Sequence, residues 1–268
     1  MGILANNEGK ILRSNQTGDI LKQNYNFGNG FYKGETTNCY IDFPNLMFNI
    51  QNDFSLITWF KSVQSDDAFS FQWLIRDDLD NCFLSSYRVN TNKSLISGDS
   101  WNSAFNNSYG SNTINDTIST GKTLTAAIKS GSSLTQRSDL KTNFNPSFNF
   151  QNTNYTDLYL NVGNATGGLK YNISIIPYFL LYSRAISDSE YIYLFNNKLS
   201  NPPLSLFASD IYLKNDIAEL FDFGGTIGQA VGVRDFSGNN NHGRILNLPA
   251  GTLQEQLDYA NANLFELW

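Results

Sequence analysis

The stretch YFLLYSRAISDSEYIYLFNN, residues 178–197, changes from the pattern of a strand to the pattern of a helix. Its first part is rich in aromatic and aliphatic residues, which favour a strand. Ser187 and Glu190 then form a Ser-x-x-Glu capping box, in which each side chain satisfies an unpaired backbone N–H. Tyr191 and Leu194 begin the apolar stripe of a helix of about 10 residues. The stretch predicts a strand that runs into a short helix folding back over the edge of a sheet.

Most of the remaining chain carries the two-residue period of β-strands. TLTAAIK (123–129) and DLYLNVG (157–163) alternate apolar and polar residues, as half-buried strands do. FSLITWFK (54–61) and FQWLIR (71–76) are apolar on both faces, which predicts central strands covered on two sides. Clusters of Asn, Gly and Ser between these segments are typical of turns. The pattern predicts an antiparallel sandwich.

A second helix is predicted in TLQEQLDYANANLFELW (252–268), where Thr252 and Glu255 form another capping box. Apolar residues then recur at alternating spacings of four and three, the pattern of a helical seam. They are Leu253, Leu257, Ala260, Leu264 and Leu267. Because the seam is only about two heptads long, it predicts either a helix that joins subunits or a helix that docks on its own sandwich.

The dipeptide Pro202-Pro203 marks a boundary, because the prolines stop the preceding helix and impose an extended segment. We therefore expect three parts. They are an N-terminal arm (1–24), a β-sandwich (25–200) and a C-terminal extension (201–268).

Three stretches together resemble the laminin G-like, concanavalin A-like jelly-roll superfamily. Residues 178–197 resemble its closing signature, a strand ending in Tyr-x-Arg-Ala-Leu-Ser-Asp, with Ile186 in place of the usual Leu. GFYKGETTNCYIDFP (30–44) followed by FSLITWFK (54–61) resembles the early strands, and VRDFSGNNNHGRI (233–245) resembles the first-strand motif. The expected fold is an all-β, antiparallel jelly-roll β-sandwich with one short capping helix and a C-terminal helix. The resemblance also implies a binding module for glycans or proteins.

The first-strand motif stands near the end of this chain, and the residues after it are too few for another sandwich. The strand segment 217–247 therefore has three possible positions. It can complete its own sandwich, exchange into the sandwich of a neighbouring chain, or form a separate small hairpin. The sequence leaves these alternatives open.

The composition excludes some classes of partner. The formal net charge is -6, with 18 Lys and Arg against 24 Asp and Glu and no basic cluster, so no nucleic-acid partner is expected. No apolar window is long enough to cross a bilayer, and no membrane span is expected. The two cysteines, Cys39 and Cys82, follow no metal or redox spacing and are expected to be buried free thiols.

The sequence carries no recognisable catalytic motif. The Glu-x-Asp-x-x-Glu strand motif of glucanases on this fold is missing, and no two glutamates have its spacing. The only histidine, His242, lies in a turn motif without a nucleophile signature. We therefore expect no enzymatic activity.

Two oxygen-rich turns are candidates for a structural calcium ion, and no other cofactor is expected. In DFSGNNNHG the candidates are Asp235 and Asn239, although the glycine and glutamate positions of an EF-hand are not matched. In RDDLDN they are Asp78, Asp80 and Asn81. The alternative for both turns is a polar turn that binds no metal.

A glycan site needs an exposed aromatic face beside amide and hydroxyl groups, because sugar rings stack on aromatic rings while their hydroxyls need polar partners. Trp59 and Trp73 lie in apolar strands and are expected in the core. The polar segment SGDSWNSAFNNSYGSN (97–112) is the better place for a stacking platform. Its candidate residues are Trp101, Asn106, Asn107 and Tyr109, and the alternative for Trp101 is a loop side chain that folds back onto the sandwich as a plug.

The sequence predicts a non-enzymatic structural or attachment protein on a lectin-like sandwich, of the kind found in bacteriophage fibres and virion decorations. The Asn- and Ser-rich β composition, an exchangeable late strand and the C-terminal seam suit that hypothesis. Its partners would be copies of itself, other virion proteins and cell-surface glycans, and its location the virion surface. The alternative is a carbohydrate-binding module of a bacterial surface or secreted protein.

Overall fold

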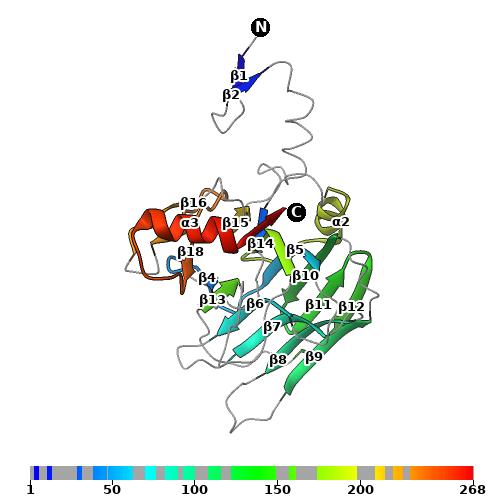
Figure 1. The fold of residues 1–268 in the computed structure, drawn as a ribbon. Helices are drawn as coiled ribbons and strands as arrows, with labels where there is room; N and C mark the ends of the chain where they lie inside the picture. The colour runs from blue at the N-terminus through cyan, green and yellow to red at the C-terminus, as the bar shows by residue number, and fades with distance from the viewer. Residues whose placement is uncertain are drawn as a thin grey trace.

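A computed structural model shows an all-β antiparallel sandwich with two helices, which confirms the predicted jelly-roll fold class (Figure 1). The residues that the structure describes are 3–5, 11–13, 29–31, 39–46, 48–62, 70–76, 82–89, 93–99, 108–115, 122–148, 157–160, 174–197, 209–214, 220–225 and 230–267.

One sheet has eight strands within the described residues, and each pairing between them is antiparallel. The strands are β3 (Asn29–Phe31), β5 (Phe54–Ser62), β10 (Lys122–Ser130), β11 (Ser133–Ser138), β12 (Lys141–Asn145), β14 (Ser174–Tyr182), β15 (Ile211–Lys214) and β19 (Phe265–Leu267). Their order is β12–β11–β10–β5–β14–β3–β19, and β15 also pairs with β14. The strand β12 is therefore one edge of this sheet.

The second sheet has nine strands within the described residues and is also antiparallel. The strands are β4 (Tyr40–Asp42), β6 (Ser70–Arg76), β7 (Cys82–Val89), β8 (Lys93–Asp99), β9 (Ser108–Asn115), β13 (Asp157–Leu160), β16 (Leu220–Asp222), β17 (Val231–Val233) and β18 (Gly243–Leu246). Their order is β16–β17–β18–β4–β13–β6–β7–β8–β9. β1 (Ile3–Ala5) and β2 (Ile11–Arg13) pair only with each other and lie apart from the sandwich (Figure 1).

The main core lies between the two sheets, because both sheets contribute their apolar faces to one cluster. Trp73 on β6 is 1% exposed and belongs to it, together with Phe54 and Leu56 on β5. Cys39 also belongs to this cluster as a buried thiol, as expected, and donates to the Asn247 carbonyl at 3.4 Å. The prediction that Trp73 is a core residue is confirmed.

A second cluster covers the outer face of the eight-stranded sheet. Ile57 and Trp59 on β5 belong to it, so this strand is buried on both faces, as its sequence predicts. Helix α2 (Asp188–Asn196) lies on this face and contributes Tyr191 and Leu194. Burying each such side chain stabilises the fold by about 1.5–3 kcal/mol. The strands β5, β10 and β14 of this sheet are therefore covered on both faces.

Helix α3 (Leu253–Asn263) begins at Thr252 with the predicted capping box but ends earlier than its periodicity suggests. Residues 265–267 form β19, which pairs with Phe31, Gly30 and Asn29 on β3. Pairing with a distant strand overrides the local helical pattern, so the prediction that Leu267 continues the helical seam is wrong. No helix in the described part of the chain combines the length and apolar character needed to span a membrane.

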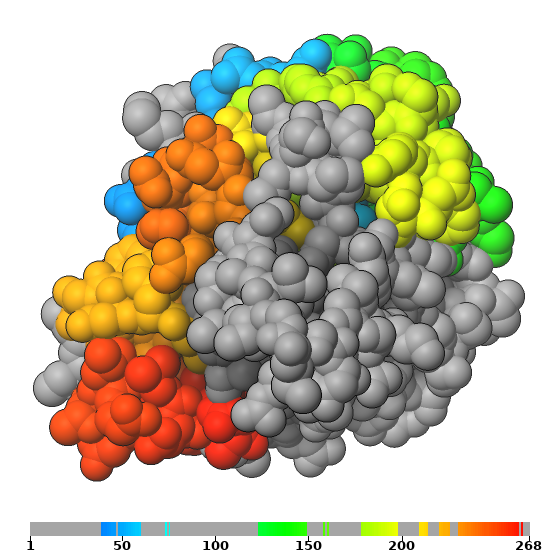
Figure 2. Space-filling view, turned by 90° about the horizontal axis from the view of Figure 1, so that it is seen from above, coloured from blue at the N-terminus to red at the C-terminus, as the bar shows by residue number. Residues whose placement is uncertain are grey.

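The late strands complete the sandwich of their own chain. On β18, Arg244, Ile245 and Leu246 pair with Asp42, Ile41 and Tyr40 on β4, and β17 and β16 follow outward. The sequence leaves three positions open for the segment 217–247. The structure shows the first of them, in which the segment completes its own sandwich. In Figure 2 this C-terminal segment, in orange and red, lies on the side of the molecule opposite α2, in yellow.

The late strands approach β4 too closely for a larger residue at one position. A Cβ atom on Gly243 would lie 2.5 Å from the Cγ2 atom of Ile41, which is fully buried. Gly243 therefore permits the close contact between β18 and the core.

We expect Gly243→Ala to destabilise the protein by about 1–3 kcal/mol, because the added methyl group overpacks a buried contact. Urea unfolding at neutral pH would measure the change. Asn261→Ala, at an exposed position of α3, is the control and should leave the unfolding midpoint nearly unchanged. Equal midpoints for Gly243→Ala and the wild-type chain would show that this contact does not limit packing.

Candidate functional site

The predicted stacking platform falls mostly outside the described residues. Trp101, Asn106 and Asn107 lie there, and they remain predictions. Tyr109 lies near the start of β9, the edge strand of the nine-stranded sheet. The structure therefore places one of the four candidates on a sheet edge and does not test the others.

That edge meets the edge of the other sheet. β9 packs beside β11 and β12, so the two sheets approach each other along one side of the sandwich (Figure 1). The structure thereby brings the strand of Tyr109 next to the hairpin formed by β11 and β12. We call this side, from β9 to the β11–β12 hairpin, the sandwich edge.

The sandwich edge carries an exposed aromatic ring that the sequence analysis missed. Phe144 on β12 is 57% exposed, and Leu140 at the hairpin turn is 65% exposed. Leu134 on β11 points into the core, so its neighbour Thr135 points outward. Phe144 lies opposite Thr135 and shares this outer face. The sequence could have indicated this exposed ring, because Phe144 is the only apolar residue in the polar strand KTNFN (141–145).

The turn of the hairpin that carries Phe144 is anchored by hydrogen bonds. Asp139 has φ 49° and exchanges two hydrogen bonds with Leu124 on β10: its N–H donates to the carbonyl at 2.8 Å, and its Oδ1 accepts from the N–H at 3.0 Å. The carbonyl of Asp139 also accepts from the Tyr191 hydroxyl at 2.8 Å. The hairpin is therefore held by β10 and by α2, which gives Phe144 a rigid support.

Helix α2 flanks the hairpin with an ion pair. The Arg137 guanidinium on β11 donates to the Asp188 carboxylate at the start of α2 and lies 4.8 Å from the ring centroid of Tyr191. Ile192, one turn beyond Asp188 and on the same side of the helix, is 36% exposed. The large apolar residues classed as exposed in the described part of the chain thus all lie on this hairpin or on α2.

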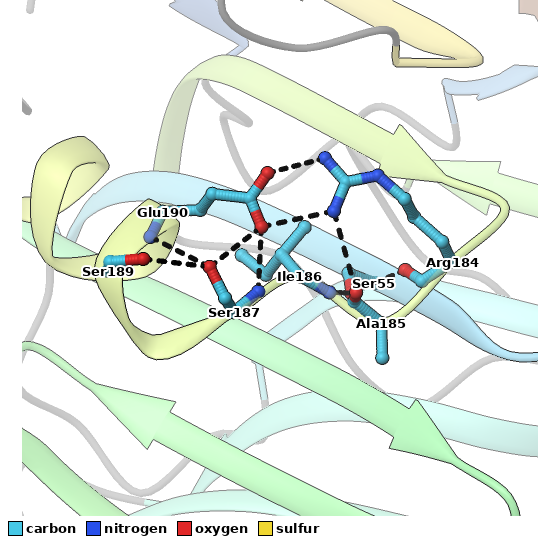
Figure 3. Close-up of polar contacts among 7 residues, drawn as sticks. All are labelled: Ser55, Arg184, Ala185, Ile186, Ser187, Ser189 and Glu190. Atoms are coloured by element: carbon cyan, nitrogen blue, oxygen red, sulfur yellow. Dashed lines mark hydrogen bonds and ion pairs between the residues drawn. The ribbon is translucent and has the colours of Figure 1, made fainter.

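A hydrogen-bonded corner fixes α2 to the sheet (Figure 3). The Ser55 hydroxyl on β5 donates to the Arg184 carbonyl at 2.8 Å and accepts from the Ile186 N–H at 2.9 Å. Ser55 belongs to the same cross-strand row as Phe144, through Ile128 on β10 and Thr135 on β11. Ser55, which orients α2, and Phe144, which carries the exposed ring, therefore belong to the same row of paired residues across the sheet.

Two charged residues of the segment 178–197, Arg184 and Glu190, pair within this corner. Arg184 donates two hydrogen bonds to Glu190, at 3.0 and 2.5 Å. Glu190 also accepts from the Ser187 N–H at 2.7 Å, which completes the predicted capping box. Hydrogen bonding from Arg184, reinforced by Ser187 and opposed by burial, lowers the pKa of Glu190 to about 2. Glu190 is therefore a structural carboxylate.

The metal candidates of the SGNNNHG loop have other partners. Asp235 is 6% exposed, and its Oδ1 accepts the backbone N–H groups of Tyr212 and Ser237, both at 2.9 Å. Its Oδ2 accepts the Asn241 N–H at 3.0 Å and the Ser237 hydroxyl at 2.7 Å. These donors direct partial positive charge at the carboxylate, as a cation would. Asp235 is therefore a structural hydrogen-bond acceptor, and calcium binding by this loop stays a prediction.

The side-chain amides of this loop donate to carbonyls that lie just before β15. Asn239 donates through Nδ2 to the Ser209 carbonyl at 2.8 Å, and Asn241 donates to the Asp210 carbonyl at 2.9 Å. The loop therefore ties the start of β15 to β17 and β18. Asp78, Asp80 and Asn81 lie outside the described residues. Within the described residues, no group of three or more His, Cys, Asp or Glu side chains is placed to hold a metal.

The histidine and two glutamates also have structural contacts. His242 accepts the Asp235 N–H at Nδ1, at 2.9 Å, and its ring meets the Phe221 ring edge-on at 5.0 Å. Glu190 and Glu255 are the N3 residues of the two capping boxes. Each of these three side chains therefore has a structural contact that accounts for its position.

The candidate seam of α3 contacts its own sandwich. Ala260 and Leu264 are fully buried in the main core, and Leu253 and Leu257 pack against it. Helix α3 therefore has the docked position, the second of the two alternatives for this seam. These four side chains are engaged within the chain, which argues against their use as a seam between subunits.

No family model matches the sequence, and no curated protein matches it. Several solved structures are distantly similar to it. They include the CBM40 of Ruminococcus gnavus IT-sialidase bound to α2,3 sialyllactose (11% identity, TM-score 0.43, covering 63% of this chain and 95% of that chain). They also include Trypanosoma rangeli sialidase (11%, 0.43, covering 57% and 24%) and the botulinum neurotoxin serotype C1 binding domain (12%, 0.43, covering 57% and 38%).

The chain thus spans 24% of the sialidase chain and 38% of the neurotoxin domain structure. At these identities the similarity concerns the fold alone. The fold itself is established by the strand pairing of this chain.

We expect Glu190→Gln to lose stability at neutral pH and to show a weaker acid dependence than the wild-type chain. Because the pKa of Glu190 is lowered from 4.5 to about 2, its stabilising contribution is complete above pH 4.5 and is lost as the pH falls toward 2. Urea unfolding at pH 7, 4 and 3 would measure this difference.

The matched control is Glu255→Gln, at the same capping position of α3. Thr252 lowers the pKa of Glu255 by hydrogen bonding, and Glu255 is fully exposed, so a smaller effect is expected. Parallel stability curves for the wild-type chain and Glu190→Gln between pH 4.5 and 2 would refute the role assigned to Glu190.

Proposed function

We propose that this protein is a non-catalytic carbohydrate-binding module that attaches to glycans through the sandwich edge. The observation that carries the proposal is the exposed ring of Phe144 on a rigid hairpin, beside outward-facing hydroxyl groups. An aromatic face binds the C–H face of a sugar ring, and nearby hydroxyls satisfy the hydroxyls of the sugar.

The finer hypothesis, a bacteriophage fibre or decoration protein that assembles with itself and with other virion proteins, rests on family usage and composition. Two of its supports have a different explanation, because β18 pairs within the chain and α3 packs on the chain's own core. This favours a single-chain binding module of a bacterial surface or secreted protein. Light scattering separates the hypotheses, since a stable dimer or trimer would restore the virion protein as the leading one.

Binding would be tested on a glycan array with the full chain, followed by titration of each glycan that binds. We expect Phe144→Ala to weaken binding about tenfold or more, because the variant removes the stacking surface. Phe144→Tyr keeps the ring and should retain most of the affinity.

Leu140→Ala is the matched control for this experiment. It removes a similarly exposed apolar side chain from the same hairpin without removing a ring, and binding should persist. If Phe144→Ala binds every captured glycan as tightly as the wild-type chain does, the site lies elsewhere. If the array captures no glycan, the proposed function itself fails.

A further inference from the structure

The outer face around Phe144 carries hydroxyl groups. Thr135 lies directly across from Phe144 on β11, and Thr142 lies two residues before it on the same face of β12. Ser133 lies two residues from Thr135, and its hydroxyl donates to the Ser130 carbonyl at 2.7 Å. The ring is therefore bordered by two threonine hydroxyls that can donate to or accept from a bound sugar.

The guanidinium of Arg137, a positive charge on this face, is paired with a carboxylate. Arg137 is paired with Asp188, lies over the Tyr191 ring, and has a side chain that is only 10% exposed. Asp188 is 85% exposed. Lys141 alternates with Thr142 and lies on the opposite face of β12. Among the described side chains on this face, the exposed charge is therefore the Asp188 carboxylate rather than a cation.

We propose that the sandwich edge selects neutral oligosaccharides over acidic ones, an inference that rests on the proposed function. A neutral sugar places one ring face on Phe144 and exchanges hydrogen bonds with Thr135 and Thr142. A sugar that carries a carboxylate meets the like charge of Asp188, and Arg137 is already occupied. Losing the hydration of that carboxylate without gaining a cationic partner disfavours the acidic ligand.

The test compares lactose-terminated oligosaccharides with their α2,3-sialylated counterparts, titrated against the full chain. We expect the neutral member of each pair to bind at least fivefold more tightly, and Phe144→Ala to abolish the difference. Thr135→Val removes a hydroxyl at nearly constant volume and should weaken neutral binding about threefold. Because these variants change outward-facing residues, we expect each of them to remain folded. Unfolding curves would check this.

Asp188→Asn tests the charge argument directly. The variant keeps the size of the side chain but releases the Arg137 guanidinium from its carboxylate partner. We expect the sialylated ligand to gain at least threefold in affinity relative to the neutral one. The same ratio in the variant and the wild-type chain would contradict the role assigned to the Arg137–Asp188 pair.

The outcomes separate the two proposals. Tighter binding of the sialylated ligand that is lost in Phe144→Ala would overturn the neutral preference while supporting the proposed function. Glycan binding that is unaffected by Phe144→Ala would overturn the assignment of the site. Binding of neither ligand class, or capture of a protein through Leu140 and Ile192 instead, would overturn both.

Discussion

The pairing of β18 with β4 is the constraint on which the rest of this structure depends. It joins residues near the two ends of the chain, with Arg244 and Asp42 linked both by the strand register and by two side-chain hydrogen bonds. Once β18 is in place, β17 and β16 extend the sheet, and α3 returns across the core to deliver β19 to β3. A strand motif that stands late in the sequence thereby becomes an interior strand of its own sheet.

The polar residues that attract attention in the sequence serve either this closure of the late strands or the attachment of α2. Asp235 gathers backbone N–H groups from its own loop and from β15, and the amides of Asn239 and Asn241 bind the carbonyls beside it. Glu190 and Arg184 hold the corner where β14 turns into α2. A buried carboxylate such as Asp235 is costly unless it is paired, and here it is paired with groups of the chain itself.

The surface available for binding lies away from this closure, where the edges of the two sheets meet. β9 and β12 both end their sheets there, and the hairpin that carries Phe144 is anchored by Asp139 to β10 and α2. This exposed ring, bordered by hydroxyls and by an arginine paired with Asp188, is the surface that we propose as a carbohydrate platform. The closing signature contributes indirectly, because it positions the helix that supplies Asp188.

The sequence by itself determined the elements that depend on neighbouring residues: the alternating strands, the burial of Trp59 and Trp73, and the two capping boxes. It indicated the sandwich edge only through Tyr109 and missed Phe144. The tertiary structure alone decided that β18 pairs within its own chain, that residues 265–267 join β3 as a strand, and that Phe144 faces outward. Caps and the periodicity of strands and helices act between residues two to four positions apart, whereas Arg244 and Asp42 are 202 positions apart, and no local pattern specifies such a partner.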